Sequence, residues 1–181
     1  MIKINMGCGW RNFGDEWTHI DGGDYEHLDY SSITKLSQYE DNSVSLIYAS
    51  HVIEYFDRDE VETLLKEWYR VMKPGGIVRI AVPNFETITS LYSQQKYELD
   101  SFLGLLYGKM PMKNETIYHK TVYDFDSLSK ILKNKIGFRE VKKYHWQNTE
   151  HSKYDDHSQA YLPHMDKENG VLMSLNVEAK K

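Results

Sequence analysis

The chain has 181 residues and carries 22 Lys and Arg against 27 Asp and Glu, a net charge of −5. Its length predicts one domain over residues 1–181, and a composition of 40% hydrophobic and 27% charged residues excludes wholesale disorder. The acidic balance argues against a nucleic-acid partner, because such proteins need an excess of basic side chains to neutralise phosphates.

The first half of the chain alternates strand-like and helix-like patterns. Short apolar runs predict strands at residues 2–6, 17–20, 44–50 and 76–82. Between the last two strands, residues 57–72 repeat apolar side chains at helical spacing after a capping box formed by Asp57 and Glu60. Lys73-Pro74-Gly75-Gly76 ends this helix and turns the chain into the next strand. A strand, a helix and a second strand predict a parallel pair joined by a right-handed crossover.

The second half is less regular but continues the α/β pattern. We expect helices at residues 84–95, 99–107 and 124–136, and strands at residues 138–146 and 170–179. Residues 110–121 are expected to form a loop of polar and aromatic side chains. Gly137 is placed where the third helix should end. Residues 151–169 are polar, and we expect them to form a surface loop.

Glycines and carboxylates follow the predicted strands, at the edge of an open α/β sheet where ligands bind. Gly7 and Gly9 remove side chains where the backbone can approach a ligand. A carboxylate at Asp21 can accept hydrogen bonds from both ribose hydroxyls, and one at Asp29 can accept from an exocyclic amine. This set describes a nucleoside site, although Gly-Cys-Gly alone is equally consistent with a tight turn. Asn12 stands where the dinucleotide fingerprint requires its third glycine.

Four segments within residues 2–95 carry a family resemblance: INMGCG, WTHID, VSLIYASHVIEYF and LLKEWYRVMKPGGIVRIAVPNFE. In this order and spacing they resemble class I S-adenosylmethionine-dependent methyltransferases, most closely the small type-11-like members often found with polysaccharide-synthesis enzymes. The resemblance implies S-adenosylmethionine as cofactor. It also implies a Rossmann-like three-layer sandwich whose mostly parallel, seven-stranded sheet has one antiparallel closing strand.

One departure from the family pattern concerns the first helix. Only 11 residues separate Gly9 from Asp21, so this helix is expected to be shortened to about a turn or lost. Since the first predicted strand begins at residue 2, the helix that often precedes it in this family is not expected here. The cofactor site is therefore expected to be open, or covered by another segment, by a second copy in a homodimer or by a partner subunit.

The resemblance assigns roles to residues at the ends of the strands. The Gly-Cys-Gly turn would line the methionyl and ribosyl part of the cofactor, and Asp21 would bind the ribose hydroxyls. Asp29 and Tyr30 would flank the adenine, while Ser50 and His51 would border the sulfonium. The complete expected lining is Met6, Gly7, Cys8, Gly9, Asp21, Gly22, Asp29, Tyr30, Ser50, His51 and Tyr55.

Methyl transfer is an in-line displacement in which the acceptor loses a proton, so a hydroxyl acceptor would benefit from a base. The catalytic candidates are, in order, His51, His119 and His145. His51 is next to the expected cofactor, and His119 lies in a loop typical of acceptor binding. Glu54 would contribute to an acidic wall for the sulfonium. His51 and Glu54 stand at i and i+3 without a third ligand at suitable spacing, so no metal is predicted.

The expected function is methyl transfer from S-adenosylmethionine to a small-molecule or glycan acceptor, at a hydroxyl. The alternative is a catalytically inactive methyltransferase-like binding or regulatory subunit, and a nicotinamide dehydrogenase is disfavoured by the missing third glycine. Aromatic platforms for a sugar are expected among Trp10, Tyr55, Tyr92, Tyr107 and Tyr118. Because the sequence has neither a signal-peptide pattern nor a membrane-length apolar run, a cytoplasmic protein is expected. The single Cys8 excludes an internal disulfide.

Overall fold

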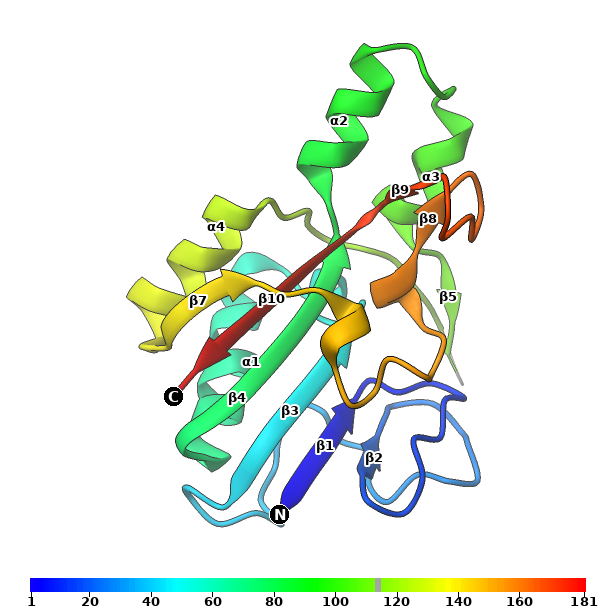
Figure 1. Cartoon of the computed structure of the whole chain (residues 1–181). Coiled ribbons are helices and arrows are strands. Elements are labelled where there is room, and N and C mark those ends of the chain that lie inside the picture. Colours follow the sequence, from blue (N-terminus) through cyan, green and yellow to red (C-terminus); the bar gives the residue numbers. More distant parts are fainter. Residues whose placement is uncertain (113–114) are drawn as a thin grey trace.

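The computed structural model describes residues 1–112 and 115–181, and its centre is one six-stranded sheet (Figure 1). The strands lie in the order β2-β1-β3-β4-β10-β7. Their bounds are β1 Ile2–Met6, β2 Thr18–Ile20, β3 Val44–Ser50, β4 Met72–Pro83, β7 Arg139–Lys143 and β10 Ser174–Lys180. The predictions for residues 2–6 and 44–50 are confirmed at both ends.

The strand directions make this a mixed, mainly parallel sheet. β1 pairs in parallel with β2 and β3. β3 pairs in parallel with β4, which confirms the prediction from the strand-helix-strand pattern. β10 runs antiparallel to both of its neighbours, β4 and β7. The described sheet has six strands and not the seven expected, because only one parallel bridge, between Ile20 and Tyr30, continues it beyond β2. The residues after Tyr30 are mostly exposed and polar, so a further strand there would bury little apolar surface.

The predicted turn at residues 73–76 becomes a bulge inside β4. Val44 of β3 pairs with Met72, but Leu46, two residues on, pairs with Ile77. The residues between Met72 and Ile77 therefore loop out of the ladder. Gly75 has a φ of 76°, in the left-handed region that glycine adopts without strain.

Helix α1, Arg58–Val71, covers one face of the sheet. The predicted capping box is confirmed, because Asp57 accepts from the Glu60 N–H and the Glu60 side chain accepts from the Asp57 N–H. Trp68 is fully buried, and its indole N–H donates to the Ile33 carbonyl at 3.0 Å, which ties the preceding loop to the helix. The buried stripe of α1 consists of Val61, Leu64, Leu65, Trp68 and Val71.

Replacing Asp57 with alanine is expected to lower the free energy of unfolding by about 1 kcal/mol, because the Asp59 and Glu60 N–H groups lose their acceptor. Chemical denaturation measures this difference. Asp59→Ala removes a neighbouring exposed carboxylate that does not cap the helix, and it should change stability by less than about 0.5 kcal/mol. Equal losses in the two variants would assign the effect to charge at the helix end and contradict the capping explanation.

Two further helices extend the layer formed by α1. They are α4, Phe125–Lys130, and the π-helix η2, Ile131–Ile136. Leu128 and Leu132 are fully buried in the same apolar cluster as the α1 stripe. The chain leaves this helical segment at Gly137, whose φ is 103°. Throughout the part of the chain that the structure describes, no helix has the length and apolar character needed to cross a membrane.

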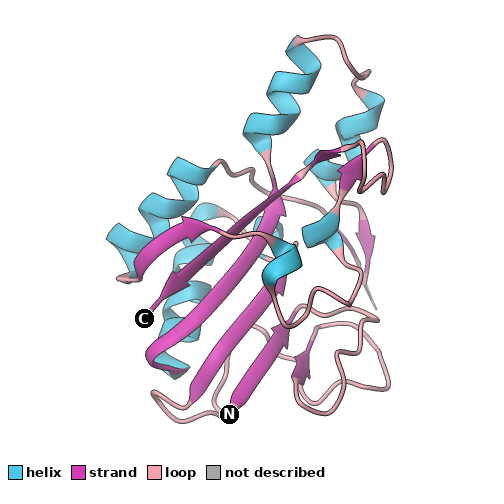
Figure 2. Cartoon of the chain, in the orientation of Figure 1, coloured by secondary structure: helices cyan, strands magenta, loops and turns pink. Residues whose placement is uncertain are grey.

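The opposite face of the sheet is covered by irregular chain with short helical turns (Figure 2). Phe13 and Trp17 pack there against Leu46 and Tyr48 of β3. Residues 10–17 contain no helix, so the first helix, which was expected to be shortened or lost, is lost. Helices therefore form the layer on one face of the sheet. Aromatic side chains anchor an irregular cover on the other face, because the link between β1 and β2 is too short for a packed helix.

The rest of this cover is residues 144–160, which we call the strap. It contains the short 3-10 helices η3, Trp146–Asn148, and η4, His157–Gln159. The prediction that residues 151–169 form a surface loop is wrong for the strap, because His151, Asp156, Ser158 and Gln159 are buried. The sheet presents polar partners on this face, and they satisfy part of the strap's buried hydrogen-bonding groups. The Asn176 amide, for example, donates to the Ser158 carbonyl at 2.9 Å.

A projection stands beyond the carboxyl end of β4 (Figure 1). It comprises α2 Phe85–Ser93, α3 Asp100–Tyr107 and the small hairpin of β8 Tyr161–Leu162 with β9 Val171–Leu172. A second small hairpin, β5 Met110–Pro111 with β6 Thr116–Ile117, follows α3 and lies lower, with β5 beside the body (Figure 1). The predicted helices at 84–95 and 99–107 are confirmed, and the strand predicted at 170–179 is divided between β9 and β10. The expected loop at 110–121 holds the first hairpin, and residues 113 and 114 lie outside the described residues.

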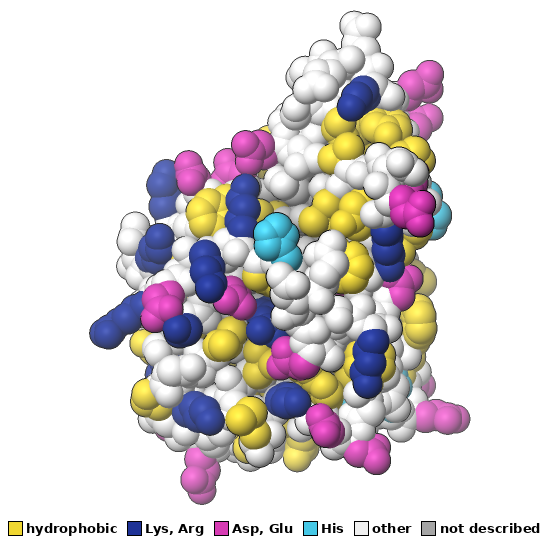
Figure 3. All heavy atoms as spheres, viewed as in Figure 1, with side chains coloured by type: hydrophobic (Ala, Val, Ile, Leu, Met, Phe, Trp, Pro, Cys, Tyr) yellow, Lys and Arg dark blue, Asp and Glu magenta, His cyan; other side chains and the backbone are white. Residues whose placement is uncertain are grey.

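The surface differs between the projection and the body. Figure 3 shows hydrophobic side chains gathered on the upper part of this view, whereas Lys and Arg are interspersed with Asp and Glu over the lower part. The large apolar side chains exposed on α2, α3 and the following loop are Phe85, Tyr92, Leu99, Leu103, Tyr107, Met110 and Tyr118. The projection therefore exposes a group of large apolar side chains.

Candidate active site

The glycine turn after β1 performs two different tasks. Both Gly7 and Gly9 have positive φ, 64° and 56°. A Cβ on Gly7 would lie 2.3 Å from the Val52 side chain, so this glycine allows close packing inside the protein. A Cβ on Gly9 would meet nothing within 4 Å, so this glycine borders open space. Of the two, only Gly9 presents a bare backbone that a ligand could approach.

The residues beside these glycines point inward. Met6 is fully buried in the core on the α1 side, so its side chain does not line the expected cofactor site. Cys8 is buried, and burial together with the charge of Asp21 raises the pKa of its thiol to about 12. A thiol with that pKa is protonated at neutral pH and is not a nucleophile.

Asp21 follows β2 and holds the turn together. Its Oδ2 accepts from the Gly9 N–H at 2.8 Å, and its Oδ1 accepts from the Gly23 N–H at 2.7 Å. A carboxylate has about four lone-pair positions, so each oxygen can accept one more hydrogen bond. Asp21 is half-buried and Gly22 is exposed, which leaves the carboxylate accessible from outside.

Asp29 and Tyr30 lie at the same edge, next to the end of β2. Asp29 Oδ2 accepts from the His19 N–H at 2.8 Å, while half of the Asp29 side chain stays exposed. Tyr30 is also exposed, with its ring 6.0 Å from that of Tyr39 in an edge-to-face arrangement. These positions fit a flat polar group held at the edge of the sheet.

Ser50 and His51 end β3. The His51 N–H still donates to the Ala81 carbonyl at 2.8 Å, but its backbone has a φ of 55°. This left-handed conformation is uncommon for a residue with a side chain, and it persists only where the surrounding structure enforces it. Burial lowers the pKa of the His51 imidazole well below its usual value, so the ring is neutral near pH 7.

Glu54 brings two of the catalytic candidates together. Its Oε1 lies 3.4 Å from His51 Nδ1 and 3.8 Å from His119 Nε2. Burial also lowers the pKa of His119. For Glu54 burial raises the pKa to about 8, so this carboxyl is mostly uncharged near neutral pH and does not supply the acidic wall expected of it.

The remaining candidates lie apart from this cluster or only beside it. Tyr55 donates its hydroxyl to the Gly108 carbonyl at 2.8 Å and places its ring against His119. It therefore supports the loop before β5. His145 is exposed at the start of η3, and no contact within the described residues joins it to His51 or His119.

The strap contributes residues to the site that the sequence did not predict. Asp156 accepts from the Tyr48 hydroxyl at 2.5 Å and lies 3.4 Å from Ser50 Oγ. The His157 ring lies 5.1 Å from that of His51. Arg11 Nε donates to the Asp155 carbonyl at 2.9 Å, which joins the glycine-turn segment to the strap. Asp156 two residues before Ser158 is an N-cap spacing that could have indicated η4, but its burial had no sequence signal.

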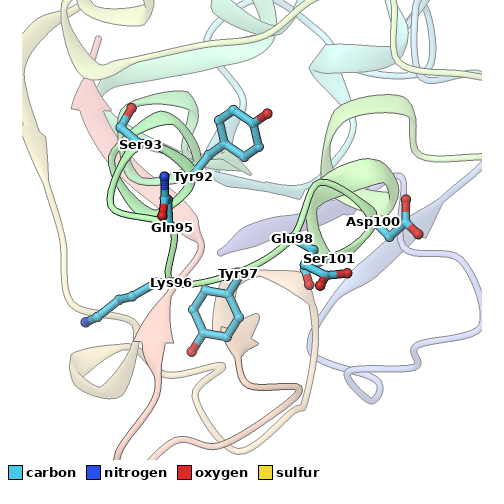
Figure 4. Close-up of a pocket in the computed structure, with 8 residues that line it drawn as sticks. All are labelled: Tyr92, Ser93, Gln95, Lys96, Tyr97, Glu98, Asp100 and Ser101. Carbon is cyan, nitrogen blue, oxygen red and sulfur yellow. The ribbon is translucent and has the colours of Figure 1, made fainter.

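An open hollow in the projection is separate from this cluster (Figure 4). It lies where α2 turns into α3, and Tyr92 and Tyr97 point away from each other there (Figure 4). Its lining residues are Tyr92, Ser93, Gln95, Lys96, Tyr97, Glu98, Asp100 and Ser101. Because these side chains do not converge, the hollow is a poorer candidate for chemistry than the ends of β1, β2 and β3.

Comparison with known proteins supports one class for this fold and site. Residues 15–80 match the model of a family described as a methyltransferase domain. This segment is less than half of the chain, and it contains Asp21, Asp29, Ser50 and His51. No curated protein matches the chain.

Solved structures resemble the whole chain. An S-adenosylmethionine-dependent methyltransferase from Archaeoglobus fulgidus superposes with a TM-score of 0.61 at 21% identity, over 99% of this chain and 86% of that one. The 1,6-didemethyltoxoflavin-N1-methyltransferase of Burkholderia thailandensis, with bound S-adenosylhomocysteine, gives 0.57 at 10% identity, over 99% and 70%. A Haloferax volcanii structure of a putative methyltransferase with the Trm112 methyltransferase activator gives 0.53 at 14% identity, over 99% and 81%.

These likenesses show that the chain has the Rossmann-like fold of S-adenosylmethionine-dependent methyltransferases. Together with the family match they support S-adenosylmethionine as the cofactor. The chain's own residues fit the nucleoside part of that molecule. Open space borders Gly9, Asp21 has acceptor positions to spare, and Asp29 stays half exposed beside it.

Proposed function

We propose that this protein transfers a methyl group from S-adenosylmethionine to a hydroxyl of a small-molecule or glycan acceptor. The observation that carries the proposal is the turn in which Asp21 accepts from the Gly9 N–H and remains accessible, at the carboxyl edge of a methyltransferase-type sheet. Such a carboxylate has the acceptor capacity to bind both hydroxyls of a ribose.

Each part of the site has a task in this reaction. When bound, S-adenosylmethionine supplies an electrophilic methyl group on a positively charged sulfur. Asp21 orients the ribose, and Asp29 accepts from the exocyclic amine of the base. Ser50 and His51 border the reacting end, where the strap excludes water. His51 or His119, both neutral near pH 7, accepts the proton that the acceptor oxygen loses.

The acceptor is proposed to bind between this site and the projection. Tyr118 precedes His119, and the His119 N–H donates to the carbonyl of Tyr107. Both tyrosines are exposed, and aromatic faces beside polar groups suit a sugar ring. His145 is left out of the proposal because it lies apart. A role in polysaccharide synthesis and a cytoplasmic location stay predictions from sequence.

The cover of the site favours the strap over a partner. Arg11 donates to the Asp155 carbonyl within the same chain, so the strap is joined to the glycine-turn segment. The strap therefore serves as the covering segment that was expected where the first helix is shortened or lost. The Haloferax volcanii methyltransferase was solved with an activator protein, so a partner subunit that adds to this cover is a second possibility for this chain.

Calorimetry with S-adenosylhomocysteine tests cofactor binding first. The protein is then incubated with methyl-labelled cofactor and a panel of sugars, nucleotide-sugars, small alcohols and amines. Binding with label transferred to a hydroxyl compound supports the proposal. Absence of S-adenosylhomocysteine binding would overturn the proposal. Label transferred only to amines would show that the acceptor is an amine and not a hydroxyl compound.

The alternative is an inactive methyltransferase-like binding or regulatory subunit. The observation that favours it is the low exposure of the His51 and His119 side chains, 8% and 3%. Cofactor binding without transfer to any acceptor, also in the presence of soluble extract from cells that express the protein, would select this alternative.

A further inference from the structure

Glu54 is a carboxyl group that the packing isolates. It lies in the 3-10 helix η1, Ile53–Tyr55, and is fully buried. Neither of its side-chain oxygens has a hydrogen-bond partner among the described residues. An ionised carboxylate in such a place is strongly disfavoured, and burial raises the pKa of Glu54 to about 8. Near neutral pH, Glu54 therefore holds a proton that it can donate.

One imidazole beside Glu54 is ready to accept that proton. His119 Nδ1 lies 3.0 Å from the Leu105 carbonyl, which can only accept, so Nδ1 carries the ring proton. The neutral ring then has a lone pair on Nε2, the nitrogen 3.8 Å from Glu54 Oε1. A movement of less than about 1 Å brings these atoms to hydrogen-bond distance.

The other imidazole is placed to donate to Glu54. His51 Nδ1 lies 3.4 Å from the same Oε1, and His51 Nε2 lies 3.4 Å from Ser174 Oγ. An Nδ1–H on His51 would donate to Glu54 and leave the lone pair on Nε2. The left-handed backbone of His51 holds the ring in this position at the end of β3.

We propose that Glu54 is a positioning residue that joins His51 and His119 into one proton relay. A proton arriving at His51 Nε2 releases the proton of Nδ1 to Glu54 Oε1. Glu54 passes its own proton to His119 Nε2. The net result is that His51 and Glu54 end neutral, while His119 carries the added proton and its positive charge. Use of this relay for the acceptor's proton rests on the proposed function.

The surroundings confine the relay to these three groups. Tyr55 and Tyr123 flank Glu54, and burial raises the pKa of Tyr55 to about 12 and that of Tyr123 still higher. Arg58 stacks on the Tyr123 ring, and on the other side His157 and Arg11 lie near His51. Burial lowers the pKa of His157. The pKa shifts of Tyr55, Tyr123 and His157 all lead away from pH 8, so a transition there reports Glu54.

The test follows the histidine ring nitrogens by NMR in protein with ¹⁵N-labelled histidine, without cofactor, from pH 6 to 9.5. The expected result is an Nδ1–H form for both His51 and His119 and one shared transition near pH 8 in their signals. In Glu54→Gln, which keeps the shape and cannot ionise, both Nδ1–H forms persist and the transition disappears. Separate midpoints for the two rings, or an unchanged transition in Glu54→Gln, would overturn the relay.

Two further measurements separate the relay from a structural role. As the pH rises from about 4.5 to about 8, the free energy of unfolding of the wild type is expected to fall relative to that of Glu54→Gln. The reason is that the folded protein keeps the Glu54 proton over this range, whereas the unfolded chain has released it. With a hydroxyl acceptor, kcat of Glu54→Gln should fall about 100-fold with KM unchanged. An unchanged kcat overturns the relay even where methyl transfer is established.

Glu86→Gln makes the same chemical change on the exposed surface of α2 and is the matched control. It should keep the shared transition and the wild-type kcat. Failure of the proposed function would appear differently. The NMR transition needs neither cofactor nor acceptor, so a protein that shows the transition and binds no S-adenosylhomocysteine has lost the proposed function but not the coupling of the two histidines.

Discussion

Replacing Asp21 with alanine is expected to weaken the binding of S-adenosylhomocysteine at least about 100-fold. Two ribose hydroxyls donating to a carboxylate contribute on the order of 3 kcal/mol together, and 1.4 kcal/mol corresponds to a factor of ten. The variant also removes the acceptor of the Gly9 and Gly23 N–H groups, so the glycine turn loses its fixed shape. Isothermal titration calorimetry measures the change.

Two variants separate these contributions. Asp15→Ala removes the same charge from an exposed position nearby and should leave the affinity within about twofold, because a single screened surface charge contributes little. Asp21→Asn keeps the size of the side chain but lacks the second acceptor atom, so its affinity should lie between those of wild type and Asp21→Ala. Wild-type affinity in Asp21→Ala would remove the nucleoside site from this turn.

The elements predicted best from the sequence are those that a single apolar pattern specifies. β1 and β3 are buried strands with apolar residues throughout or in alternation, and α1 combines a capping box with a stripe of buried side chains. In each case the local propensity and the packing agree. The missing seventh strand is the opposite case, because a strand at a sheet edge depends on its neighbour and its own residues are mostly polar.

The strap shows why polarity alone misleads. A run such as Asp155-Asp156-His157-Ser158 indicates a surface loop when the sheet is assumed to be apolar on both faces. The sheet is polar on part of this face, where Tyr48, Arg79 and Asn176 bind the strap. The Tyr48–Asp156 and Arg79–Glu150 pairs join segments more than 70 residues apart in the sequence, and such long-range pairing has no local signature.

The candidate site divides in the same way. Asp21 and His51 could be predicted, because each follows a strand whose carboxyl end is fixed by the order of elements. The spacing of His51 and Glu54 placed those two together. Their link to His119 could not be predicted, since it depends on how the loop around β6 returns to the sheet. Gly7 allows close packing against Val52, whereas Gly9 borders open space. This difference likewise could not be predicted, because it depends on the position of Val52 in the folded chain.

Replacing Asp156 with alanine is expected to lower the free energy of unfolding by about 3 kcal/mol. Asp156 is buried and accepts from the Tyr48 hydroxyl and the Ser158 N–H. Without it both donors are buried and unpaired, and each such group costs about 1–3 kcal/mol. The strap should also open locally, so hydrogen exchange at residues 144–160 should speed up more than in α1. Denaturation and exchange measured by mass spectrometry test the two effects.

Tyr48→Phe is the matched control, because it removes only the hydroxyl and leaves Asp156 paired with Ser158. Its loss should be smaller, about 1–2 kcal/mol. The double variant, Tyr48→Phe with Asp156→Ala, removes both partners of this hydrogen bond, so neither is left unpaired. Its loss of unfolding free energy should therefore be smaller than the sum of the two single losses by at least about 1 kcal/mol. Strictly additive losses would mean that the strap is held by its other contacts. In that case Arg79 with Glu150, joined at 2.6 Å, becomes the pair to test, since it binds the strap to β4 on the same face.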